Sequence, residues 1–233
     1  MSKYFICCYL FFTTCYISAQ GGNLGQGSGV DDVRSLSSYT TGAWISNSNQ
    51  ATEIKGSPYL LDNWNTISVI STTEGKQYKL EGLNYNIVLD RMIARISKDS
   101  VYSFNPSGIN EVRLGSHTFK RYLDPEYGDN NFFEIISNNK GKILLKRYRK
   151  QIKDGVFNPM TQKESPSKYL SEVDYFMTNS NNLLRKLPMN NRKLIKFLTN
   201  SKSSELQKFI SENKFSAKKE SDLVEIFDYF TSI

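Results

Sequence analysis

The chain has few of the side chains on which most catalytic and metal sites depend. It contains three cysteines, Cys7, Cys8 and Cys15, and one histidine, His117. A single histidine excludes a multi-histidine metal site, and every cysteine lies in the first fifteen residues. No Gly-x-Ser-x-Gly motif is present, and a lone histidine after Gly115-Ser116 is typical of a solvated surface turn. The sequence therefore predicts no resident cofactor and no metal site.

Long apolar runs are also scarce, and the one that exists lies at the N-terminus. It follows Lys3, covers residues 4–19 and ends in Ser18-Ala19-Gln20. A basic start, an apolar middle and a small residue before the cut are typical of a secretory signal peptide. We expect cleavage after Ala19, which removes every thiol and leaves no transmembrane span. The alternative, an uncleaved anchor, is disfavoured by the shortness of the run. The mature protein is then exported and lies in the periplasm, at the outer membrane or outside the cell.

Residues 20–53 are poor in large apolar side chains and rich in glycine, serine, asparagine and threonine. Such a composition buries too little surface to offset the entropy of ordering. We predict a flexible leader here, with a short pairing segment around Trp44-Ile45. The glycines at 25, 27 and 29 follow the cleavage site rather than a strand, so they are interpreted as a linker rather than a phosphate loop.

Residues 54–188 show strand-like patterns separated by short turns. Because no helix long enough for a parallel crossover fits between the runs, the sheet is expected to be antiparallel. The predicted fold class is α+β, with an antiparallel β-meander that is barrel- or sandwich-like. The predicted strands cover residues 64–72, 76–83, 85–90, 92–96, 101–104, 119–123, 132–137 and 142–152, with weaker signals at 168–170, 173–177 and 183–187.

After Pro188 the apolar period changes from two to three or four residues, which predicts amphipathic helices. The apolar clusters lie at residues 194–198, 206–210 and 223–230. Each helix is too short to be stable alone, so we expect residues 189–233 to form three short helices that pack as a cap on the β domain.

Several short motifs resemble those of a family of exported, β-rich proteins of unknown function from Gram-negative envelopes. They are Gly56-Ser57-Pro58-Tyr59-Leu60, Gly75-Lys76-x-Tyr78, Leu83-Asn84-Tyr85-Asn86, Asp90, Lys146-Arg147-Tyr148 and Asp222-Leu223-Val224-Glu225-Ile226. The resemblance covers about residues 56–233. It implies an exported meander with a helical C-terminal cap, and it brings no catalytic residues.

The basic residues are unevenly distributed, since seven of the 30 lie between residues 140 and 153 with no acid among them. On a strand, both faces would be basic, which favours an edge strand or a projecting hairpin. One interpretation is protection of a sheet edge; the other is attraction to an anionic surface. The candidate binding residues are Lys140, Lys142, Lys146, Arg147, Arg149, Lys150 and Lys153.

These patterns favour a non-catalytic binding or structural module that contacts an anionic envelope component through the basic hairpin. The expected partners are an envelope protein, an anionic lipid or an acidic polysaccharide. Nucleic acid is not expected, because an exported protein rarely meets it and Tyr148 is the only aromatic residue among the cations.

Two other functions stay open. A hydrolase acting on envelope polysaccharide needs two carboxylates across a cleft, and the candidates with aromatic neighbours are Asp124, Glu126, Asp129 and Glu134. The alternative interpretation of that segment is a surface loop. A carrier of apolar ligands needs a meander that closes around a lumen.

Overall fold

The computed structural model describes residues 33–34, 36–37, 41–46, 54–97, 100–178, 183–199 and 203–233. The predicted signal peptide and most of the predicted leader lie outside these residues. No helix in the described part of the chain has the length and apolar character needed to cross a membrane.

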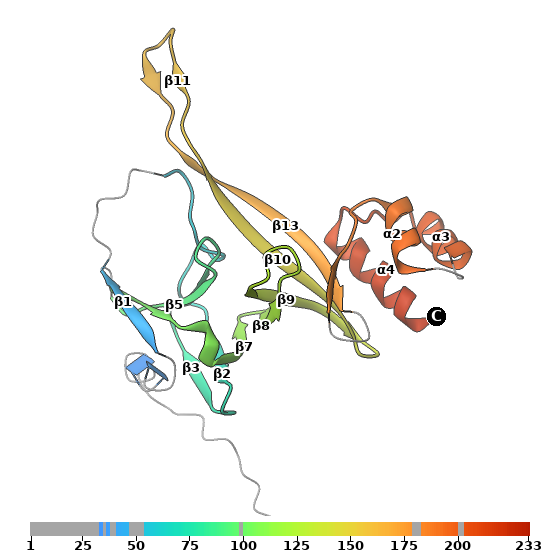
Figure 1. The fold of residues 1–233 in the computed structure, drawn as a ribbon, viewed down its shortest axis with the longest axis horizontal. Coiled ribbons are helices and arrows are strands. Elements are labelled where there is room, and N and C mark those ends of the chain that lie inside the picture. The colour runs from blue at the N-terminus through green and yellow to red at the C-terminus, as the bar shows by residue number, and fades with distance from the viewer. Residues whose placement is uncertain are drawn as a thin grey trace, which may run out of the picture.

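Three C-terminal helices, a two-stranded ribbon and two main antiparallel sheets are present in the described part of the chain (Figure 1). The smaller sheet has the order β1-β6-β5-β4, formed by Gly42–Ser46, Ser100–Phe104, Arg91–Arg95 and Leu83–Asn86. The larger sheet has the order β14-β13-β10-β9-β8-β7-β2-β3, formed by Leu184–Lys186, Lys168–Thr178, Lys142–Lys153, Asn130–Asn139, His117–Leu123, Ile109–Leu114, Ser68–Thr72 and Gln77–Leu80.

The antiparallel pairing of the strands and the three helices confirm the predicted antiparallel α+β class. Because both sheets are open, the fold is sandwich-like rather than a closed barrel. The larger sheet ends at β14 on one side and β3 on the other, so its described strands do not close around a lumen. The carrier hypothesis required such a lumen.

The main hydrophobic core lies between the smaller sheet and the β2, β3, β7 and β8 part of the larger one. Its fully buried members include Tyr85 from β4, Phe104 from β6 and Phe119 from β8. Val33 and Leu36 are buried in the same core, and β1 pairs with β6. Within the predicted leader, the pairing segment expected around Trp44-Ile45 is thus present as β1, and Val33 and Leu36 contribute to the core, whereas Trp44 and Ile45 are 59% and 38% exposed.

The three predicted C-terminal helices are present as α2 (Asn191–Leu198), α3 (Ser203–Glu212) and α4 (Glu220–Ser232). The side chain of Asn190 caps α2 by accepting a hydrogen bond from the backbone N–H of Lys193 at 3.2 Å. Helix α4 packs against β9 and β10, and its buried side chains Leu223, Ile226 and Phe227 join Leu144 of β10 in a second core. The helices thus cap one end of the larger sheet (Figure 1).

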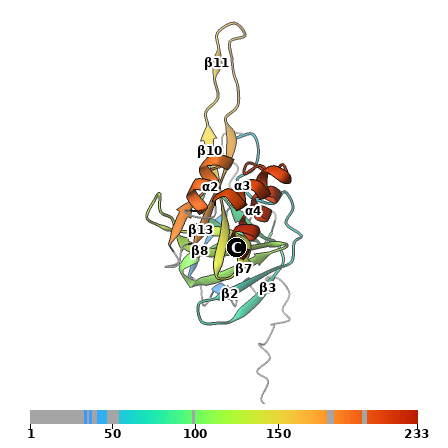
Figure 2. The same ribbon diagram turned by 90° about the vertical axis from the view of Figure 1, so that its right-hand side faces the viewer.

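Strands β10 and β13 extend beyond their neighbours as a two-stranded arm. Strand β9 pairs with β10 only as far as Lys146, whereas the β10–β13 pairing continues to Lys153 and Lys168. We call residues 147–174 the arm and residues 154–167 its tip; the tip contains the short strands β11 (Phe157–Asn158) and β12 (Lys163–Glu164). The arm projects away from the rest of the chain in both views (Figures 1 and 2). Residues 147–153 of the basic segment thus lie on a projecting hairpin, where β10 pairs with β13 alone, whereas residues 142–146 lie inside the sheet beside β9.

Candidate functional site

The basic residues of β10 alternate between its two faces, as a strand requires. Arg147 and Arg149 point to one face, and Lys146 and Lys150 contact residues on the other. Each face meets carboxylates that come from distant segments of the chain. These contacts decide which of the seven candidate cations remain available to a ligand.

Arg147 is buried at the base of the arm, where its side chain is 9% exposed. Its Nη1 atom donates to Asp90 Oδ1 at 2.7 Å, to the Phe132 carbonyl at 3.0 Å and to the Tyr85 hydroxyl at 3.1 Å. The Nε atom lies 3.6 Å from Oδ2 of the fully buried Asp124. Burial acts to lower the pKa of Arg147, but Tyr85 and Asp90 outweigh it and raise that pKa, so the guanidinium stays charged.

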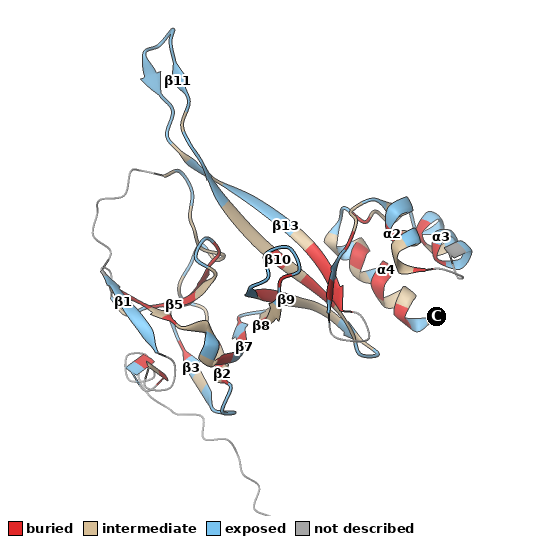
Figure 3. Cartoon of the chain, viewed as in Figure 1, coloured by how far each residue is buried: buried red, intermediate tan, exposed pale blue. Residues whose placement is uncertain are grey.

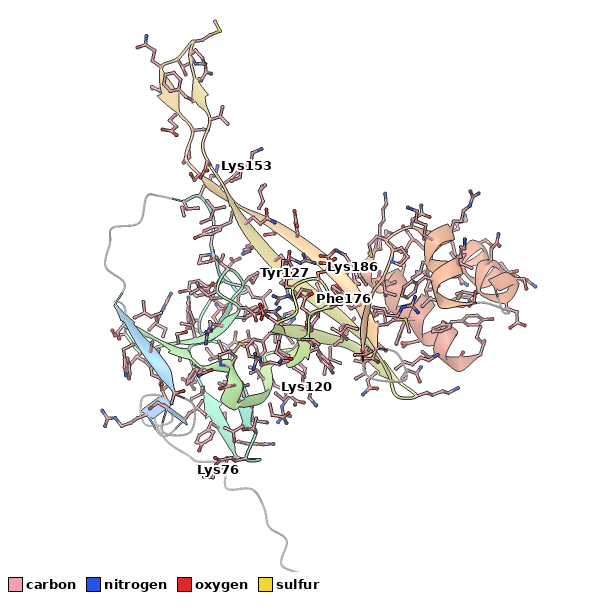
Figure 4. All side chains as sticks on the ribbon, in the orientation of Figure 1. Lys76, Lys120, Tyr127, Lys153, Phe176 and Lys186 are labelled. Atoms are coloured by element: carbon pink, nitrogen blue, oxygen red, sulfur yellow. The ribbon has the colours of Figure 1, made fainter. Side chains whose placement is uncertain are left out.

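Arg149 belongs to a second ion-pair network on the same face. It donates to Glu126 Oε2 at 2.5 Å and to a carboxylate oxygen of Asp174. Lys186 of β14 pairs with the same two carboxylates, at 2.9 Å from each. Hydrogen bonds from Lys186 and Arg149 hold the pKa of Glu126 below its usual value. Arg149 also donates to the Tyr127 hydroxyl at 2.9 Å, and Figure 4 labels Tyr127 and Lys186 near the base of the arm, with Lys153 farther along it.

On the opposite face, the buried Glu134 and the half-buried Glu220 contact polar side chains of β8, β10 and β13. Glu134 accepts a hydrogen bond from the Tyr148 hydroxyl at 2.5 Å and lies 2.5 Å from His117 Nδ1. Glu220, in the first turn of α4, accepts from Lys146 and from the Tyr175 hydroxyl, each at 2.6 Å. These contacts attach the helical cap to the sheet.

Burial and hydrogen bonds together set the directions of the pKa shifts on this face. The bond to Glu134 raises the pKa of His117. Burial and the same carboxylate raise the pKa of Tyr148, so its hydroxyl stays a donor. Burial alone would raise the pKa of Glu220, but the bonds from Lys146 and Tyr175 leave it below its usual value. His117 is thus half-buried and bonded to a carboxylate, in contrast to the solvated turn residue expected from the sequence.

The other lysines of the basic segment are partly engaged as well. Lys140 Nζ donates to the Ser232 carbonyl at 3.2 Å, and Lys142 Nζ lies 4.2 Å from the centre of the Phe230 ring. Lys150 Nζ donates to the carbonyls of Ser57 and Tyr59 at 2.7 and 2.9 Å. Lys153 alone has no such contact with the described residues. Most of the predicted basic face is therefore bound internally, by partners that are remote in sequence.

The four acids of the hydrolase hypothesis do not meet in one groove among the described residues. Asp124 is buried beside Arg147 and accepts from the Glu126 backbone N–H at 2.9 Å, as a turn residue does. Glu126 is paired with Arg149 and Lys186, and Glu134 lies on the opposite face of the sheet. Asp129 lines a cavity of about 320 Å³ at the base of the arm. Within the described ranges, no three histidine, cysteine or acidic side chains gather as a metal site.

The tip of the arm is the exposed feature that the sequence analysis missed. Val156, Phe157 and Met160 are 66%, 58% and 94% exposed, and the outer part of the tip, residues 156–166, is drawn as exposed in Figure 3. Exposed Lys153, Lys163 and Lys168 flank these apolar side chains. The available signal was an apolar pair after Gly155 and a methionine after Pro159, inside a stretch of turn residues.

Comparisons with known proteins add no relative: no protein-family model matches the chain, and no curated protein or solved structure is significantly similar to it. The resemblance to exported envelope proteins therefore stays a prediction.

Proposed function

We propose that the protein is an exported, non-catalytic binding module that contacts an anionic membrane surface of the cell envelope through the tip of its arm. One observation carries the proposal: a two-stranded arm that leaves the sheet ends in exposed apolar side chains flanked by exposed lysines. An isolated two-stranded ribbon is marginally stable in water, and contiguous exposed apolar groups are typical of interaction sites.

Energetic estimates favour a lipid surface over other anionic partners. Full burial of side chains such as Val156, Phe157 and Met160 would contribute about 1.5–3 kcal/mol each. A lysine near an anionic bilayer adds about 1 kcal/mol. Asp154 and Glu164 also lie on the tip and offset part of that attraction. Apolar insertion would thus supply most of the binding free energy, while the lysines would favour anionic headgroups. A soluble polysaccharide offers no apolar phase for these side chains.

The residues proposed here for binding differ from the cluster of basic residues that the sequence pointed to. Arg147 and Arg149 are held by carboxylates, so reversing their charge would damage the fold and reveal nothing about a ligand. The informative cations are Lys153, Lys163 and Lys168.

The experiment is vesicle flotation of residues 20–233 with phosphatidylcholine vesicles and with vesicles containing phosphatidylglycerol. We expect flotation with the anionic vesicles, weakened by salt. The double variant Phe157→Asp/Met160→Asp should lose flotation, and the triple variant Lys153→Glu/Lys163→Glu/Lys168→Glu should lose it as well. The matched controls are Ile67→Asp, at a residue that is 52% exposed on the body of the molecule, and Lys79→Glu on β3.

If both tip variants still float with the anionic vesicles, the proposal is refuted. So would binding to an acidic polysaccharide, such as polygalacturonate, with no binding to vesicles. Flotation that is equally strong with neutral vesicles would reject the role of the lysines.

A further inference from the structure

A second surface feature lies far from the arm, between helices α2 and α3. These helices and the segment after α3, residues 213–219, enclose a groove of about 630 Å³. This volume is within the size range of small-molecule sites. Its apolar floor is formed by Ile195, Ile210 and Phe215. Because Ile195 and Ile210 also belong to the second core, the floor is part of the folded cap.

The rim of the groove is cationic. Arg192 and Lys196 from α2 and Lys214 after α3 line it, and no carboxylate does so among the described residues. Two acidic residues close in sequence to the lining contact other groups: Glu212 pairs with Lys208, and Asp222 accepts a hydrogen bond from the Ser216 backbone N–H. The rim charges are thus left uncompensated by the described chain, which favours an anionic ligand.

Hydrogen bonds fix the shape of the groove. The side chain of Asn191 donates to the Phe215 carbonyl at 2.8 Å and accepts from the Ala217 backbone N–H at 2.7 Å, so it joins the start of α2 to the segment after α3. The Phe209 ring packs edge-on against the Phe215 ring, with the ring centres 5.5 Å apart. It also stacks on the Tyr229 ring, with the ring centres 3.9 Å apart. A groove held in this way loses little entropy when a ligand binds.

We propose that this groove binds a small amphiphilic anion, in which a carboxylate or phosphate is joined to an apolar chain. The cationic rim would hold the headgroup, and the apolar floor would accept the chain. The inference is independent of the arm, because no residue of the arm lines the groove.

The test is a calorimetric titration of residues 20–233 with octanoate and octyl phosphate, accompanied by amide chemical-shift mapping. We expect saturable binding of both, with shifts confined to α2, α3 and the segment after α3. The triple variant Arg192→Gln/Lys196→Gln/Lys214→Gln should weaken binding roughly tenfold or more. Lys193→Gln is the matched control, because Lys193 is exposed on α2 and does not line the groove. The uncharged 1-octanol and inorganic phosphate should each bind more weakly than octanoate.

Absence of saturable binding would overturn the inference, as would binding that the triple variant leaves unchanged. Shifts that map to the arm tip instead of the groove would also overturn it. The double variant Phe157→Asp/Met160→Asp should retain octanoate binding, so the two proposals can fail separately.

Discussion

At the scale of single residues, Arg147 joins segments that are far apart in the sequence. Its guanidinium contacts Asp90 in the turn after β4, Asp124 after β8 and the Phe132 carbonyl on β9. Water is largely excluded from this position, so the charges depend on one another for compensation. The residue therefore connects these segments of the fold, and it also lines the cavity of about 320 Å³ at the base of the arm.

The substitution Arg147→Met tests this role. It keeps the apolar stem and leaves Asp90 and Asp124 without their cation, so we expect the free energy of unfolding to fall by about 3–5 kcal/mol. Urea denaturation followed by fluorescence measures the change. The control Arg113→Met alters an exposed arginine on β7 and should change stability by less than about 0.5 kcal/mol. Equal stability of the two variants would show that the buried carboxylates need no compensation.

At the scale of elements, the arm divides into a half that is attached to the body and a half that is not. Lys150 donates to two carbonyls of the 57–59 segment, and the Lys55 backbone N–H donates to the Ser167 carbonyl at 2.8 Å. Residues 155–166 lie beyond these attachments, and none of them belongs to a hydrophobic core of the described chain. The outer half therefore contributes little to the stability of the body.

Replacing residues 155–166 with Asn-Gly tests this division. Lys153 and Lys168 face each other in the β10–β13 register, so the next pair, Asp154 and Ser167, can be joined by a two-residue turn. We expect Tm to change by no more than about 2 °C, while flotation with anionic vesicles is lost. A large fall in Tm would mean that the tip supports the body. Unchanged Tm with full flotation would remove the tip from the binding surface.

Much of the element pattern was predictable because local periodicity determines it. The three helices and most strands follow apolar spacing in the sequence. Strand β7 was missed because Asn110 and Glu111 interrupt the alternation between Ile109 and Val112, at a point where the pairing of β2 with β7 also shifts register. The ion pairs of Arg147 and Arg149 were not predictable, because Asp90, Glu126 and Asp174 reach them only through the tertiary fold.

At the scale of the whole molecule, the described chain consists of a body, formed by the two main sheets and the helical cap, and of the projecting arm. The two sheets and the helical cap bury the apolar side chains and neutralise most of the β10 cations internally. Among the exposed features of the described residues, the arm tip and the groove between α2 and α3 are the ones for which we propose a ligand. The sequence indicated a basic hairpin over residues 140–153. Because most of its cations are paired internally, we place the proposed contact farther out, at the apolar tip with Lys153, Lys163 and Lys168.

The most direct test of the central claim places a reporter on the tip itself. Residues 20–233 contain no cysteine, so Met160→Cys creates a unique site for an environment-sensitive fluorophore, and Ile67→Cys provides the control on the body. With phosphatidylglycerol vesicles, the probe at position 160 should shift its emission to the blue as it enters the bilayer, and the probe at position 67 should not. An unchanged spectrum at position 160, under conditions in which the protein floats with the vesicles, would contradict insertion of the tip.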